Sequence, residues 1–356
     1  MSSTTTKVFL TGATGYIGGQ VAYELVNSKE HKFVVTALVR SQQKAEKLKA
    51  ASDNKIIPVI GTLDDLTLLG KQVEENDVII NTANVDHVPS AQALSDALSE
   101  AKEKKILIHT SGTSVLGDGL DAKKGATTKV YSDKYDIDEI NSLDLEQPHR
   151  PVDKIILDIH DRNPKVEVAI ICPSTIYGIS NGYDNVVSAQ IPWLIKSTIR
   201  HNKGYSVFDG NYVWNHIHIK DLGDLYLLLL NKLLRGDDVP ANRQGYYFGS
   251  YAIEGEEKVT TEPSEIEHTW RQVSAAVAES LFAKGVIESK EVDSLQPEPI
   301  IKLNDSEWAP YYWGTNSRSR GDNGYAIGWK PKHISNKEFF ESIDADVDYQ
   351  LKHSKT

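Results

Sequence analysis

A glycine-rich turn near the beginning of the chain places the strongest constraint on its fold. The segment KVFLTGATGYIGGQ, residues 7–20, passes from an apolar run through Gly12, Gly15 and Gly18 into an apolar-periodic segment. This order predicts a strand, a tight turn and a helix. Side chains at the glycines would keep a diphosphate away from the amides at the positive end of the helix dipole. We therefore predict a dinucleotide site in which the first glycine turns the chain, the second admits the phosphates and the third packs helix on strand; the alternative is an ordinary strand-to-helix turn.

Further strands and helices alternate along the first half of the chain. Apolar or β-branched runs predict strands at 33–39, 56–60, 77–82, 105–111 and 165–172, with helical segments between them. Pro58 makes the strand at 56–60 short or places it at an edge. The alternation predicts an α/β fold with a doubly wound parallel sheet, whose ligands bind at the carboxyl ends of the strands.

The second half is less regular. Residues 112–147 are predicted to form a long loop and 148–161 a helix. Beyond them we predict helices at 188–200, 221–234 and 263–284, and strands at 214–219 and 245–251. We expect a dinucleotide-binding domain over 1–175 and a smaller, mixed α/β substrate-binding part over 176–356 that returns partly to the first sheet.

Composition narrows the range of partners and locations. The net charge of -11 argues against nucleic acid and against an anionic membrane as partners. The most apolar run, 225–230, is too short to cross a bilayer, and residues 1–7 lack the apolar region of a secretory signal. The single cysteine, Cys172, excludes an intramolecular disulfide. We expect a cytoplasmic protein with a small-molecule substrate, as a monomer or a homodimer.

The end of the second predicted strand indicates which dinucleotide binds. NAD sites usually carry an acidic residue there for the ribose hydroxyls, whereas an arginine suits a 2′-phosphate. No Asp or Glu occurs between Phe33 and Lys44, and the strand ends at Arg40. Arg40, helped by Lys44, therefore predicts NADP(H); the alternative is a solvated basic residue at a helix start.

Six segments in order carry a resemblance along nearly the whole chain: TGATGYIGG, NTAN, HTSGTSVLG, CPSTIYG, WNHIHIKDLGDLY and IGWKPK. Together they resemble the extended or atypical short-chain dehydrogenase/reductase superfamily, with a Rossmann fold of the NAD-dependent epimerase/dehydratase type. The resemblance implies cofactor contacts from Gly12, Thr14, Gly15, Tyr16, Ile17, Gly18, Arg40, Lys44, Thr62, Leu63, Ala83, Asn84, Lys154, Pro173, Thr175 and Ile176.

The catalytic pattern of that superfamily is incomplete here. Its acid is a tyrosine four residues before a lysine, but no tyrosine of this chain has a lysine at that spacing, and Arg150 stands four residues before Lys154. The resemblance gives Lys154 a ribose-binding role, against the alternative of a surface lysine. For the group that polarises the carbonyl the alignment falls across Ser111, Gly112 and Thr113, of which Ser111 matches best.

The proton source and the substrate walls remain open at this point. Arginine is a poor acid, so Arg150 is expected to bind substrate or to be a surface residue of the first helical turn. The proton could come from water or from a side chain; the candidates are Tyr131, Tyr135, Tyr177 and His149. Tyr177, Trp193 and Trp214 are expected either to line the substrate site or to pack in the core.

These observations predict an NADPH-dependent oxidoreductase that reduces a small carbonyl compound, with Arg150 in place of the usual tyrosine. The alternatives are an NADP(H)-binding regulator or redox sensor without catalysis, and a non-redox isomerase or lyase that keeps the cofactor. No metal is expected, because His216 and His218 lack a third ligand on their strand.

Overall fold

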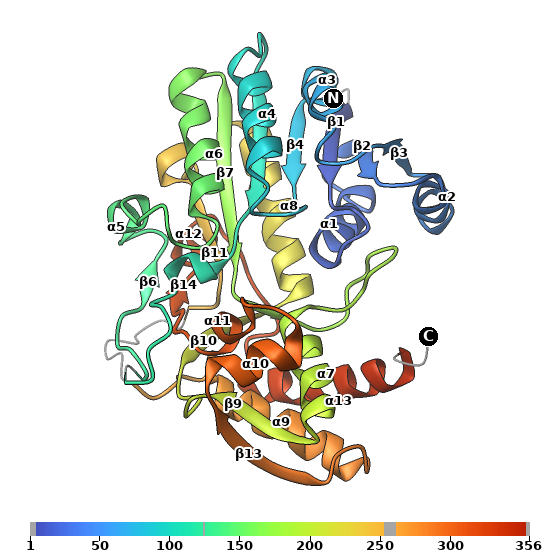
Figure 1. Ribbon diagram of the computed structural model, residues 1–356. Coiled ribbons are helices and arrows are strands. Elements are labelled where there is room, and N and C mark those ends of the chain that lie inside the picture. The colour runs from blue at the N-terminus through green and yellow to red at the C-terminus, as the bar shows by residue number, and fades with distance from the viewer. Residues whose placement is uncertain (1–4, 124, 253–260, 354–356) are drawn as a thin grey trace.

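A seven-stranded parallel sheet forms the centre of the protein, as predicted (Figure 1). The computed structural model describes residues 5–123, 125–252 and 261–353, so the first four residues of the segment 1–7 lie outside it. The strand order is β11-β7-β5-β4-β1-β2-β3, and every neighbouring pair is parallel. The strands are β1 (Thr5–Thr11), β2 (Lys32–Val39), β3 (Ile56–Ile60), β4 (Val78–Asn81), β5 (Lys105–Thr110), β7 (Val166–Pro173) and β11 (Tyr246–Gly249). The proline-bearing strand β3 lies at the edge, which confirms the expectation from Pro58.

Helices cover both faces of this sheet. One face packs against α1 (Tyr16–Val26), α2 (Gln42–Ala51) and α8 (Ile219–Arg235), and the other against α3 (Leu66–Glu75), α4 (Val88–Ser99) and α6 (Arg150–Arg162). Alternate residues of a strand enter opposite cores: Val8 and Leu10 join the first, and Phe9 joins the second. Both faces of the strands are therefore buried, which explains their continuous apolar runs.

A third core holds the smaller part together, which lies below the carboxyl ends of the strands in Figure 1. It contains α7 (Gln190–His201), α9 (Trp270–Ala283), α10 (Pro297–Asn304), α11 (Ala309–Trp313) and α13 (Asn336–His353), with the parallel pair β9 (Lys203–Val207) and β13 (Ser289–Leu295). Helix α13 was not anticipated, because its fully buried apolar residues, Phe339, Ile343 and Val347, form a narrow stripe. The predicted return to the first sheet is made by β11, which pairs with β7.

Two predicted segments differ in detail. The expected helix at 263–284 is divided into β12 (Glu267–Thr269) and α9, because Thr269 and Gln272 form a capping box that begins the helix at Trp270. Strand β12 pairs with β10 (Val213–His218), which also pairs with β8 (Thr175–Tyr177). The long loop at 112–147 contains three short elements, η1 (Thr113–Leu116), β6 (Tyr131–Ser132) and α5 (Ile137–Asn141).

The remaining elements are η2 (Asn242–Gln244), β14 (Ser319–Arg320), which pairs with β6, and α12 (Asp322–Ala326). Among the residues that the structure describes, no helix is both long enough and apolar enough to cross a membrane.

Candidate functional site at the carboxyl ends of the strands

The glycine turn has the shape that its sequence predicts. Gly12 has a φ of +78°, in the left-handed region that favours glycine, and a Cβ there would lie 2.6 Å from the carbonyl oxygen of Thr82. A Cβ on Gly18 would lie 2.3 Å from the carbonyl oxygen of Gly12, so the third glycine is required for close packing. The amide of Gly15 donates to that same carbonyl at 2.8 Å. Because the first-turn amides of a helix have no acceptor within it, the beginning of α1 is suited to an anion.

Basic side chains lie beside this turn, at the end of β2. Arg40 is exposed, and the Ser41 hydroxyl caps α2 by accepting from the Lys44 amide at 3.2 Å. The ammonium groups of Lys44 and Lys47 both contact the carboxylate of Asp184. Burial raises the pKa of Asp184, but the two lysines together outweigh it and hold that pKa below its usual value.

Asp184 reaches the lysines because its loop is fixed against α1. The Tyr16 hydroxyl donates to the carbonyl of Gly178 at 2.7 Å, and the amide of Asn185 donates to the carbonyl of Thr14 at 3.3 Å. The loop from 178 to 185 therefore lies along the glycine turn and places a carboxylate on Lys44, which the sequence assigns to a phosphate, and on Lys47.

Three polar side chains form a hydrogen-bonded relay beyond the ends of β4 and β5. Ser114, in η1, has its Oγ 2.7 Å from Nε2 of His149, and Nδ1 of His149 lies 2.8 Å from Oδ1 of Asp86. Asp86 follows β4, and His149 immediately precedes α6 with a φ of +66°. The hydrogen bond from His149 is the main cause that lowers the pKa of Asp86. A neutral His149 in this arrangement carries its proton on Nδ1 and accepts from Ser114 through Nε2.

A second, buried polar chain lies next to the relay. Thr11 Oγ1 donates to Asn81 Oδ1 at 2.5 Å, and Asn81 Nδ2 donates to His109 Nδ1 at 3.0 Å. Nε2 of His109 lies 3.7 Å from Oδ1 of Asp153, whose other oxygen accepts from Ser111 at 2.9 Å. Burial lowers the pKa of His109 to about 3, and His149 acts in the same direction. Burial raises the pKa of Asp153 to about 6, against the opposing influence of His149. His109 therefore favours its neutral form, and Asp153 keeps its proton to a higher pH than an exposed carboxyl does.

The residues that face the site from the beginning of α6 lie one position earlier in the sequence than the resemblance implies. Lys154 is half-exposed and pairs with Asp158, and Arg150 is buried with its guanidinium on the carbonyls of Asn141 and Leu143 and the Tyr246 hydroxyl. His149 and Asp153 instead face Ser114 and Ser111. The structure thus does not bring Arg150 or Lys154 to the relay, and this differs from the roles expected of them.

That difference had a signal in the sequence. His149 and Asp153 are four residues apart, which is the spacing of the superfamily's catalytic pair, but neither residue is of the usual type. An alignment that places Lys154 at the lysine position puts Arg150, rather than His149, at the tyrosine position. Asp153 was overlooked because a carboxylate is rarely buried without a partner, and its partner, Ser111, lies 42 residues earlier.

The other expected site residues lie at three places. Thr62 is exposed, Leu63 is partly buried, and Ala83 and Asn84 follow β4, all at the carboxyl edge of the sheet. Thr113 is fully buried, and its carbonyl accepts from Ser317. Pro173, Thr175 and Ile176 lie where β7 passes into β8.

The expected substrate walls are mostly core residues. Tyr177 is buried and donates to the carbonyl of His333 at 2.8 Å, and Trp214 is buried and donates to that of Thr315 at 2.6 Å. Trp193 is 43% exposed and packs on Tyr312. The structure places none of these three in contact with the relay.

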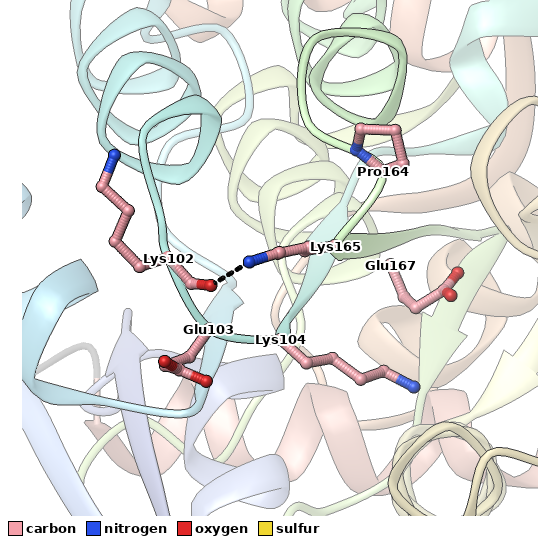
Figure 2. A pocket seen from close by; sticks show the side chains of 6 residues that line it. All are labelled: Lys102, Glu103, Lys104, Pro164, Lys165 and Glu167. Atoms are coloured by element: carbon pink, nitrogen blue, oxygen red, sulfur yellow. Dashed lines mark hydrogen bonds between the residues drawn. The ribbon is translucent and has the colours of Figure 1, made fainter.

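A surface pocket at the amino ends of the strands is not part of this site. Figure 2 shows Lys102, Glu103, Lys104, Pro164, Lys165 and Glu167 around it. These residues lie where β5 and β7 begin, whereas ligands of such sheets bind where the strands end.

Comparison with known proteins agrees with the fold. The oxidase ucsJ of Acremonium sp. is 29% identical over 338 residues, covering 92% of this chain and 93% of its own. Yeast methylglyoxal/isovaleraldehyde reductase Gre2 complexed with NADPH has a TM-score of 0.59 at 14% identity, covering 98% of this chain and 100% of its own. The dTDP-glucose 4,6-dehydratase DesIV of Streptomyces venezuelae with NAD bound has a TM-score of 0.61 at 17% identity, covering 98% and 97%. The model of the NAD dependent epimerase/dehydratase family matches residues 8–240, and the chain belongs to that family.

Proposed function

We propose that this protein is an NADP(H)-dependent oxidoreductase that reduces a small carbonyl compound. The observation that carries the proposal is the meeting of three features at one edge of the sheet. The glycine turn, the basic end of β2 and the relay of Ser114, His149 and Asp86 follow adjacent strands. Thr82, at the end of β4, donates its hydroxyl to the carbonyl of Thr11 at 2.7 Å and so joins the relay side to the glycine turn.

The residues at this edge fit a dinucleotide phosphate. The cradle at Gly12 and Gly18 is closed to any Cβ, and the amides of Tyr16 and Ile17 at the beginning of α1 would hold the diphosphate. Arg40 and Lys44 would hold a 2′-phosphate, and no carboxylate on the end of β2 competes for the ribose. When bound, a reduced nicotinamide supplies a hydride.

The names of the similar proteins support this class of reaction. One is an oxidase, and one is a carbonyl reductase complexed with NADPH. The dehydratase holds NAD, so the preference for the phosphorylated cofactor depends on Arg40 and Lys44 of this chain.

Binding of NADP(H) without turnover is a second candidate function. The observation that favours it is that Lys154 points to Asp158, while a carboxylate, Asp153, faces Ser111. A regulator or redox sensor would bind the cofactor and show no turnover; a non-redox isomerase or lyase would convert its substrate without net consumption of the cofactor.

The test measures binding and turnover separately. We expect NADPH to quench tryptophan fluorescence at lower concentration than NADH, and absorbance at 340 nm to fall with at least one member of a panel of aldehydes, ketones and quinones. Arg40→Ala should weaken NADPH binding about 10- to 100-fold, because a charged hydrogen bond contributes roughly 1.5–3 kcal/mol, and leave NADH binding unchanged. Arg235→Ala is the matched control, because Arg235 pairs with Glu30 at the end of α8. NADPH binding without turnover would select the second candidate, and no binding of either dinucleotide would overturn both.

A further inference from the structure

We propose that His149 is the acid–base residue of this site, that Asp86 fixes its ring, and that Ser114 passes the proton to the reacting oxygen. The inference rests on the proposed function and assigns the proton source that the missing tyrosine leaves open. It requires a group that can exchange a proton near neutral pH, is held in one orientation and is connected to the carboxyl ends of the strands.

The orientation of His149 is determined from both sides of the ring. Nδ1 is 2.8 Å from Asp86, and Nε2 is 2.7 Å from the Ser114 hydroxyl. Rotation of the ring by 180° would put the carbons Cδ2 and Cε1 in the places of Nδ1 and Nε2 and lose both bonds. A carboxylate on Nδ1 also stabilises the charged ring, as it does in serine–histidine–aspartate sites. His149 is therefore oriented by Asp86 for proton exchange through Nε2.

The position of Ser114 suits it to pass the proton from His149 to the reacting oxygen. It lies in η1, directly after β5, and is partly exposed. The Cβ that Gly112 lacks would lie 3.2 Å from Nε2 of His149, so glycine leaves the space that the ring occupies. A side chain at position 112 would press on the ring.

The proton balance of carbonyl reduction follows from this geometry. The carbonyl oxygen gains the hydroxyl proton of Ser114 while the carbonyl carbon gains the hydride, and the product is an alcohol. Ser114 regains a proton from Nε2 of the charged His149, which leaves the ring neutral with its remaining proton on Nδ1 towards Asp86. Solvent then restores the proton to Nε2. In the direction of alcohol oxidation each of these transfers is reversed.

The neighbouring charges are compatible with a ring that changes its charge. Asp86 faces it from the loop after β4, His109 from β5, and Asp153 from α6. Tyr312 of α11 lies near Asp86. Among the described residues, Asp86 is the only charged group that is hydrogen-bonded to the ring. Burial favours neutral His109 and raises the pKa of Asp153.

The other proton sources considered from the sequence are less well placed. Tyr177 is buried, donates to a backbone carbonyl, and burial raises its pKa further above the physiological range. Tyr135 is 74% exposed, with Lys134 over its ring. Tyr131 lies beside Lys129, and burial raises its pKa. None of these three contacts Ser111 or Ser114 through a hydrogen bond that the structure records among the described residues.

The experiment compares His149→Gln, Asp86→Asn and Ser114→Ala with wild type, and uses His160→Gln as the control. His160 lies near the other end of α6, where its Nδ1 contacts the carbonyl of Val166 at 2.7 Å. With a carbonyl substrate found in the panel, His149→Gln should lower kcat about 10²- to 10⁴-fold, the usual contribution of a positioned acid. NADPH binding by fluorescence should stay within about twofold of wild type in all four proteins, since no variant touches the phosphate-binding residues.

The pH profile and the ring tautomer give readouts that a structural role would not alter. The rate of reduction should fall at high pH along one limb that His149→Gln abolishes and that Asp86→Asn moves to lower pH, because the charged ring loses its carboxylate. In the protein without cofactor, nitrogen NMR should find the neutral His149 protonated on Nδ1, and Asp86→Asn should increase the Nε2-protonated form.

Three outcomes would overturn the inference while leaving the proposed function intact: unchanged kcat in His149→Gln, an unchanged pH limb in that variant, or a neutral ring protonated on Nε2 in wild type. A fluorophosphonate that labels Ser114 with no NADPH turnover would mean that the three residues serve acyl transfer, and would overturn both proposals. Full NADPH binding with kcat lost only in the relay variants supports both.

Discussion

Replacing Asp184 by asparagine removes the carboxylate that neutralises Lys44 and Lys47 beside the glycine turn. A 2′-phosphate that binds Lys44 has to compete with this carboxylate, because both are anions and the ammonium group already contacts Asp184. We therefore expect Asp184→Asn to tighten NADPH binding. NADH has no phosphate at that position, so its affinity should not change.

The exposure of the three side chains sets the magnitude. The Asp184 side chain is 10% exposed, but those of Lys44 and Lys47 are 43% and 57% exposed. Two unit charges 4 Å apart would interact by about 4 kcal/mol at an effective dielectric constant near 20, whereas exposed pairs contribute only about 0.2–1 kcal/mol when measured. We take the upper half of the measured range, because the carboxylate is largely covered. Relief of about 0.5–1 kcal/mol corresponds to NADPH binding that is about two- to fivefold tighter.

The assay is the fluorescence titration of both dinucleotides at low and high salt, with Asp158→Asn as the control. Asp158 pairs with Lys154 on α6, so its replacement changes the net charge equally without touching the turn. The gain for NADPH should shrink in salt, since a Debye length of about 8 Å at 0.15 M screens exposed charges. An equal gain for NADH, an equal gain in the control, or weaker NADPH binding would refute the reasoning.

Three further predictions concern Gly18, Lys154 and Asp346. Gly18→Ala should abolish NADPH binding and destabilise the protein by about 1–3 kcal/mol in thermal unfolding, because its Cβ would lie 2.3 Å from the carbonyl oxygen of Gly12; wild-type affinity would contradict the packing argument. Lys154→Ala should leave NADPH affinity and turnover within about twofold and cost less than about 1 kcal/mol of stability, because the lysine forms only an exposed pair; a collapse of activity would restore the expected ribose-binding role. Burial raises the pKa of Asp346 to about 7, so its contribution to stability is fully present below its unfolded pKa and is lost as the pH rises through about 7. Asp346→Asn should therefore raise the free energy of unfolding more at pH 8 than at pH 5, by at most about 4 kcal/mol relative to wild type. An equal change at both pH values would contradict this sign.

The sheet could be predicted from the sequence because its strands are buried on both faces. Runs such as FVVTALV and DVIINT have few polar residues, and the glycine turn fixes the direction in which the first strand meets its helix. Helix α13 could not be recognised in this way. Its stripe of Phe339, Ile343 and Val347 is one residue wide between charged positions, and it becomes apparent only when packed on α7 and α9.

The location of the candidate site could be predicted from the sequence, but the side chains that form its relay could not. The carboxyl ends of the strands, Ser111 and the basic residues after β2 follow from topology and local sequence. The relay depends on three segments far apart in the chain, with 28 residues between positions 86 and 114 and 35 between 114 and 149. Its register depends on one residue, His149, whose left-handed backbone immediately precedes α6 at Arg150.

The position of β11 has a consequence for the order in which the protein assembles during synthesis. This strand pairs with β7, yet more than 70 residues separate Pro173 from Tyr246, and α8, which covers one face of the sheet, lies within that interval. The apolar surface beneath α8 has no covering until residue 235 has left the ribosome, and the edge of β7 has no partner strand until residue 249 has left it. Contacts between such distant segments slow folding and leave apolar surface exposed in intermediates. The nascent chain is therefore most prone to aggregation after β7 has been synthesised and before β11 has been.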